Sequence, residues 1–141
     1  PGSGTIYDIT ADWERNDSTG FTQIGTGMSE SSGIFTFPQT GIYWVQLLAT
    51  TYGSGGGTTA ITVHIQTRKN NGTYAIRAQG SDQAYTTNAY GCISIDILFD
   101  VEDVSADNLK MTAQSTASGR QLLSSTTAQR TGFTFIRLGN T

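Results

Sequence analysis

The sequence predicts an all-β domain, a sandwich of short antiparallel strands of the jelly-roll type. No segment keeps an apolar i, i+3, i+4, i+7 pattern over three turns, so no substantial helix is expected. Strand-like runs rich in β-branched and aromatic residues recur instead, with turn residues between them. The 141 residues are enough for one domain, and the low share of charged residues, 13%, is typical of such a fold.

The strand-like runs fill a domain that we place at residues 4–141, because Pro1, Gly2 and Ser3 resemble the remnant of a cleaved expression tag. The glycine-rich segment 53–57 predicts a flexible loop. The Asn71–Gly72 pair tolerates the positive φ of a tight turn and predicts a hairpin. These signals predict eight or more short strands, within 5–10, 21–24, 33–37, 41–51, 59–67, 73–79, 89–101, 108–115 and 132–138.

Three of the runs, 59–67, 73–79 and 108–115, alternate apolar with polar residues. Such strands have one face in the core and the other in water. The only histidine, His64, falls on a polar face and is therefore expected at the surface. Ile76 falls on an apolar face and is expected in the core.

Three other runs, 41–51, 89–101 and 132–138, are largely apolar on both faces. A strand of this kind must be covered on both sides, and a sandwich without helices has nothing of its own to cover the second side. Another copy of the chain is the simplest cover, so we expect a permanent oligomer. Its interface is predicted to contain Ile42, Trp44, Leu48, Leu98, Ile136 and Leu138.

Two charged residues, Asp96 and Arg137, interrupt these apolar runs. Because an unpaired buried charge is costly, they are expected to pair with each other, with a neighbouring subunit or around water.

A short motif in the first half of the chain points to a known family. Phe35, Gly41 and Tyr43 have the spacing of the signature of the C1q globular head, which is Phe, five residues, Gly, any residue, Tyr. The Lys69–Gly72 turn, the 107–111 stretch and the closing Thr131-Gly132-Phe133 follow in the order of that family. From Phe21 to Leu138 the chain resembles the C1q/tumour-necrosis-factor-like head domains. It departs from the signature at Val45 and Leu47, where aromatic residues are usual.

This resemblance implies a ten-strand jelly roll assembled as a compact homotrimer, with the three doubly apolar strands in the inner sheet. Family heads sometimes hold calcium through acidic residues in the loop before the strand that here begins at Ala89. That loop offers Asp82, with Asn88 as a weaker oxygen donor. Calcium takes six to eight oxygen ligands, so Asp82 is a weak candidate and no cofactor is expected.

The residue inventory argues against an enzyme. One histidine cannot supply the several imidazoles of a metal-dependent cupin, and no nucleophile elbow accompanies it. The single cysteine, Cys92, lies in a strand-like run and is expected to be a buried, inert thiol. The net charge of -3 leaves no basic patch for nucleic acid, and no apolar run is long enough for membrane insertion.

The composition, rich in Thr, Ser and Gly and poor in Lys, resembles that of a bacteriophage or viral fibre tip or a bacterial surface protein. We therefore expect a trimeric receptor-binding head at a virion or extracellular surface, with a host surface glycan as the candidate ligand. An alternative is a structural trimerisation cap or virion decoration without a ligand. Tyr85 either stacks on a sugar or packs against its own loop. The candidate ligand-binding residues are Tyr85, Asp82, Gln83, Asn88 and Tyr52.

Overall fold

The computed structural model describes residues 4–15, 23–53, 59–116 and 118–141. This part of the chain forms ten antiparallel strands in two sheets, as the sequence predicts for a β-sandwich, and contains no helix that could span a membrane. The strands are β1 (Ile6–Asp8), β2 (Ser29–Ser31), β3 (Ile34–Thr36), β4 (Gly41–Gly53), β5 (Thr59–Arg68), β6 (Ala75–Ala84), β7 (Ala89–Val101), β8 (Asn108–Ser115), β9 (Arg120–Leu122) and β10 (Thr131–Gly139).

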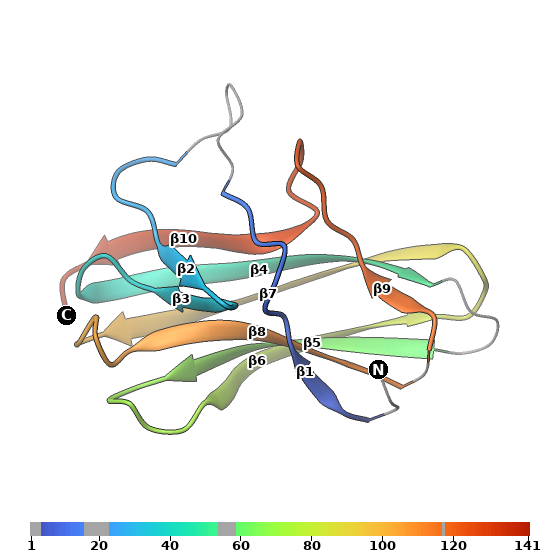
Figure 1. The fold of residues 1–141 in the computed structure, drawn as a ribbon, viewed down its shortest axis with the longest axis horizontal. Coiled ribbons are helices and arrows are strands. Elements are labelled where there is room, and N and C mark those ends of the chain that lie inside the picture. Colours follow the sequence, from blue (N-terminus) through green and yellow to red (C-terminus); the bar gives the residue numbers. More distant parts are fainter. Residues whose placement is uncertain (1–3, 16–22, 54–58, 117) are drawn as a thin grey trace.

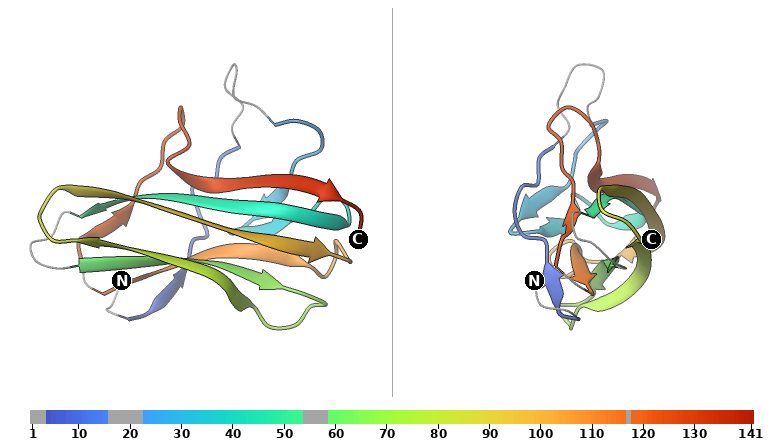
Figure 2. Two further views of the ribbon diagram at one scale, coloured as in Figure 1. Left: turned by 180° about the vertical axis from the view of Figure 1, so that it is seen from behind. Right: turned by 90° about the vertical axis from the view of Figure 1, so that its right-hand side faces the viewer.

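The two sheets face each other as layers, one of six strands and one of four (Figure 1). The larger sheet has the order β2-β3-β8-β5-β6, and β1 pairs with the second half of the β8 edge that β3 leaves open. The smaller sheet has the order β10-β4-β7, and β9 pairs with the end of β4 beyond β10. Seen from its end, the sandwich has the two layers side by side (Figure 2).

The core between the sheets consists of the inward faces of both layers. One cluster centres on Leu47, Val63 and Met111, and an aromatic cluster centres on Phe35, Phe37, Tyr43 and Phe99. The partly buried Trp13 and Phe133 pack against both clusters, and their rings stack with centroids 5.7 Å apart. The N-terminal segment therefore belongs to the same core as the strands.

The predicted hairpin between β5 and β6 is confirmed, but its central residues are Asn70 and Asn71. Both have positive φ, 51° and 55°, and the amide of Gly72 donates to the carbonyl of Lys69 at 2.9 Å. Asparagine tolerates this left-handed backbone, so the turn needs no glycine at either position.

Some predictions made from the sequence lie outside the described residues. These are the tag remnant at 1–3, most of the glycine-rich loop 53–57 and the first half of the run 21–24. The second half of that run, at 23–24, is not a strand. Two short strands, β2 and β9, were not predicted, because three-residue strands with polar residues carry little hydrophobic pattern.

The expectation that Ile76 lies in the core is wrong. The register between β5 and β6 shifts at a bulge, where Ile65 faces Ala78 but Gln66 faces Ile76. A bulge reverses the side to which the following residues point, so Ile76 joins the outer face of the larger sheet and is exposed.

Candidate functional site: the outer face of the smaller sheet

The outer face of the smaller sheet carries the apolar residues that the sequence assigned to it. Along β4, Tyr43, Val45 and Leu47 are buried in the core, while Ile42 and Trp44 point to the other side. This alternation follows from the pleat, which sends successive side chains to opposite faces. No other element of the described chain covers that side in Figure 2.

A row of three apolar residues crosses this face. Ile136 of β10 pairs with Trp44 of β4, and Trp44 pairs with Leu98 of β7. Ile42 and Leu138 extend the patch toward the end of β10, and Leu48 adds a half-buried residue further along β4. In the protomer, Leu98, Leu138 and Ile136 are 68%, 59% and 47% exposed. Complete burial of such a side chain stabilises by about 1.5–3 kcal/mol, of which the isolated protomer gains only a part.

A polar row lies next to the apolar one. Gln46 pairs with Asp96 on β7 and with Thr134 on β10. The Nε1 of Trp44 donates to Oδ2 of Asp96 at 3.3 Å, so the carboxylate already has one partner on this face.

Asp96 and Arg137 do not pair with each other within the protomer. Arg137 donates from Nε to the carbonyl of Thr40 at 3.0 Å and from Nη2 to Asn140 Oδ1 at 2.7 Å. Arg137 faces Tyr43 in the register, and Tyr43 points to the core side of β4, whereas Asp96 points to the outer side. The two side chains therefore leave the sheet in opposite directions.

Two tyrosines occupy the far end of the same face. Tyr52 of β4 pairs with Tyr90 of β7, and their ring centroids lie 4.9 Å apart with the planes tilted by 49°. The hydroxyl of Tyr52 donates to Oδ1 of Asn88, whose backbone amide donates to the carbonyl of Gly53 at 2.7 Å. Tyr90 was not among the residues predicted from the sequence, although its cross-strand position opposite Tyr52 follows from the antiparallel pairing of the two strands.

The predicted ligand residues do not form one site. Asp82 and Ala84 point from β6 into the interior, so Gln83 between them points to the outer face of the larger sheet. The hydroxyl of Tyr85 donates to Oε1 of Gln83 at 3.0 Å, which holds Tyr85 on that side. Tyr52 and Asn88 therefore belong to one face of the sandwich, and Tyr85 and Gln83 to the other.

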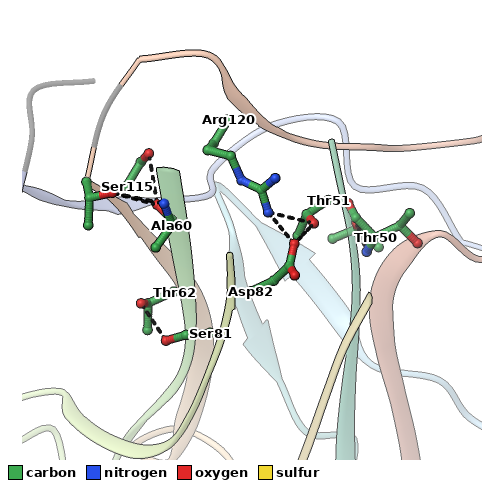
Figure 3. A network of polar contacts seen from close by, with 10 residues as sticks. Thr50, Thr51, Ala60, Thr62, Ser81, Asp82, Ser115 and Arg120 are labelled. Carbon is green, nitrogen blue, oxygen red and sulfur yellow. Dashed lines mark hydrogen bonds and ion pairs between the residues drawn. The ribbon is translucent and has the colours of Figure 1, made fainter. Parts of the chain in front are cut away.

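The side chain of Asp82 makes contacts within the protein that connect the two sheets (Figure 3). Its carboxylate accepts hydrogen bonds from the hydroxyl of Thr51 and from Nη2 of Arg120, and the latter contact is also an ion pair. The Arg120 side chain is fully buried, and its Nε and Nη1 have no partner among the described residues. The three residues link β6 of the larger sheet to β4 and β9 of the smaller one.

The charge state of Asp82 follows from these contacts. Burial alone raises the pKa of the carboxyl, but the hydrogen bonds from Thr51 and Arg120 and the charge of Arg120 hold it below its ordinary value. The carboxylate is thus neutralised by Arg120, which leaves it a poor ligand for calcium. Within the described residues no three His, Cys, Asp or Glu side chains gather as a metal site requires.

The predictions that His64 lies at the surface and that Cys92 is a buried thiol are wrong for the protomer. His64 is buried, although it lies on the outer side of β5, because its neighbours in the register, Gln79 and Thr112, flank it in the middle of the larger sheet. Its Nδ1 lies 3.0 Å from Oγ1 of Thr112, which also accepts from Nε2 of Gln66 at 3.0 Å. Cys92 is an exposed free thiol, because it points to the outer face of the smaller sheet.

Neither a protein-family model nor a curated protein matches this sequence. The likeness to C1q heads therefore depends on the motif residues, for which the structure gives physical roles. Phe35 and Tyr43 are core residues. Gly41 has a φ of 142°, and a β-carbon there would overlap the carbonyl of Gly139, so only glycine fits this position.

Proposed function

We propose that this chain is a head domain of the C1q/tumour-necrosis-factor-like jelly-roll type, which assembles as a homotrimer through the outer face of its smaller sheet. The proposed role is receptor binding at the surface of a virion, such as a phage or viral fibre, or of a cell. The observation that supports it most is the apolar row on this face, in which Ile136 and Leu98 are exposed and Trp44 between them is half-buried.

A second copy of the chain fits this face better than a charged partner does. The row itself comes from three adjacent strands and is uncharged. Of the two acidic residues that flank it, Asp96 is engaged by Trp44 and Asp100 pairs with Ile42 in the register. Contiguous exposed apolar surface on a protein marks an interaction site, and permanent interfaces are the more hydrophobic class of interface. The trimer, in preference to a dimer, comes from the resemblance carried by Phe35, Gly41 and Tyr43.

The stoichiometry is tested by sedimentation equilibrium at micromolar concentration. Three times the protomer mass of 15.0 kDa is expected. Leu98→Asp and Ile136→Asp each place a charge in the apolar row and should release folded protomers. The matched control is Ile76→Asp, because Ile76 is also exposed, at 43%, but lies on the larger sheet. A monomeric wild-type protein, or dissociation by the control alone, would contradict the proposal.

A structural cap without a ligand is the second candidate, since the apolar row would serve it equally well. The tyrosine pair at the other end of the face favours receptor binding, because assembly through the apolar row leaves two aromatic rings without a role.

A further inference from the structure

The Tyr52–Tyr90 pair presents aromatic surface to solvent at one end of the sandwich. Tyr90 is 70% exposed, and Tyr52 is half-buried beside it. A ring with this exposure contributes little burial energy to the fold. The cross-strand contact with Tyr52 holds the ring in one orientation. The pair is thus a preformed aromatic platform.

The amide of Asn88 adds directional polar groups to this platform. Asn88 has a φ of 62°, is exposed and is anchored by its backbone bond to Gly53. Its Oδ1 accepts from Tyr52, and its Nδ2 donates no hydrogen bond within the described residues. The side chain therefore offers two N–H donors next to an aromatic ring.

No charged residue lies next to the platform along its own strands. Residues within two positions of Tyr52 and of Tyr90 are uncharged, and the nearby Asp82 and Arg120 neutralise each other in the interior. The segment between β9 and β10 carries the cationic residue Arg130, whose carbonyl accepts from the backbone amide of Thr50 at 2.9 Å.

The platform is also separate from the apolar patch. Trp44 and Tyr52 lie eight positions apart on one strand, which corresponds to roughly 26 Å at about 3.3 Å per residue. The three outer-face rows between them contain Gln46 with Asp96, Leu48 with Ser94 and Thr50 with Cys92, so the half-buried Leu48 is the member of the patch that lies nearest the tyrosines. A trimer formed through the apolar row therefore leaves the tyrosines near its rim.

From these observations we infer that Tyr90, Tyr52 and Asn88 bind a neutral pyranose ring of a surface glycan. The C–H face of the sugar stacks on the phenol of Tyr90, and its hydroxyls accept from the Asn88 amide. The inference rests on the proposed receptor-binding function and names its ligand class. Tyr85 lies on the other face of the sandwich and takes no part.

The experiment uses an array of immobilised neutral hexose and N-acetylhexosamine oligosaccharides beside sialylated and uronic-acid oligosaccharides, probed with the full chain. Binding to neutral members is expected, with an affinity that falls about tenfold or more in Tyr90→Ala. Tyr90→Phe should keep most of it, because the ring remains. Tyr85→Ala is the matched control, since Tyr85 is 71% exposed and likewise lies at this end of the molecule. Arg130→Gln tests the contribution of the neighbouring cation.

The oligomeric state of each variant is measured on the same samples. Loss of neutral-glycan binding by Tyr90→Ala with an unchanged oligomer supports the inference. Three outcomes overturn the inference and leave the proposed assembly unaffected. They are absence of neutral-glycan binding, binding that survives Tyr90→Ala, and binding to acidic members alone through Arg130. Dissociation of Tyr90→Ala also overturns it, because the tyrosines then belong to the interface. A monomeric wild type that still binds through Tyr90 contradicts the proposed assembly and leaves the sugar site standing.

Discussion

Gly91 provides the space that the carboxylate of Asp82 occupies: a β-carbon on Gly91 would overlap both carboxylate oxygens. The absence of a side chain at one position of β7 thus allows the ion pair with Arg120, a residue from a distant part of the chain. The same contact brings β6 and β7, the edge strands of the two sheets, together beneath Tyr90.

The first prediction concerns this space. Gly91→Ala should displace Asp82 from Arg120 and lower the free energy of unfolding by about 3 kcal/mol, through steric overlap and a disturbed buried ion pair. Urea denaturation measures the change. Gly132→Ala is the control, because the nearest atoms to a β-carbon there lie 3.6 Å away, in ordinary contact. Equal stability of the two variants would show that Asp82 relocates without loss.

The second prediction concerns the stability of the fold at acid pH. Because the folded pKa of Asp82 lies below its ordinary value of 3.8, the unfolded chain takes up this proton first as the pH falls. The contribution of Asp82 is therefore complete above about pH 4 and is lost progressively below it. Asp82→Asn should be less stable than wild type at neutral pH, and the difference should shrink below about pH 4. Guanidinium denaturation over a pH series checks this, and a constant difference would contradict it.

The sequence predicts what depends on the strand period and misses what depends on tertiary contacts. Trp44, Leu98 and Ile136 were assigned to one outer face correctly, because the pleat fixes their direction. Ile76 was assigned wrongly, because a bulge breaks the period without a signal in composition. His64 was expected in water, because the side chains that flank it come from other strands.

The candidate site shows the same division. Tyr52 lies near the end of β4, and Asn88 directly precedes β7, the strand that pairs with β4, so the two side chains meet. Tyr85, although close in sequence to Asn88, points to the other side of the sandwich. The inward position of Asp82 depends on its contact with Arg120. Because the two residues are far apart along the chain, a local sequence pattern does not predict this pair.

The third prediction concerns His64. Burial lowers its pKa below the ordinary value of 6.5, and the hydrogen bond with Thr112 offsets part of that effect. The folded state therefore favours the neutral ring, so stability is complete above pH 6.5 and falls as the pH drops toward the lower folded pKa. His64→Gln should lose less stability than wild type between about pH 7.5 and about pH 5. Parallel pH slopes in thermal unfolding of the two proteins would rule out this role for His64.

The fourth prediction concerns Cys92, an exposed thiol whose outer-face neighbour on β4 is Thr50. Cys92 lies in the row next to Tyr52 and Tyr90, so an assembly formed at the apolar end leaves it open to solvent. Its reaction rate with a thiol-specific reagent should therefore be the same in the wild-type assembly and in the Leu98→Asp protomer. Leu138→Cys, made in a Cys92→Ser background, is the contrasting probe, because Leu138 lies in the apolar patch. That thiol should react slowly in the assembly and rapidly once Leu98→Asp is added. Protection of Cys92 in the assembly would extend the interface to the tyrosine end of the sheet, and the sugar site would then have no room.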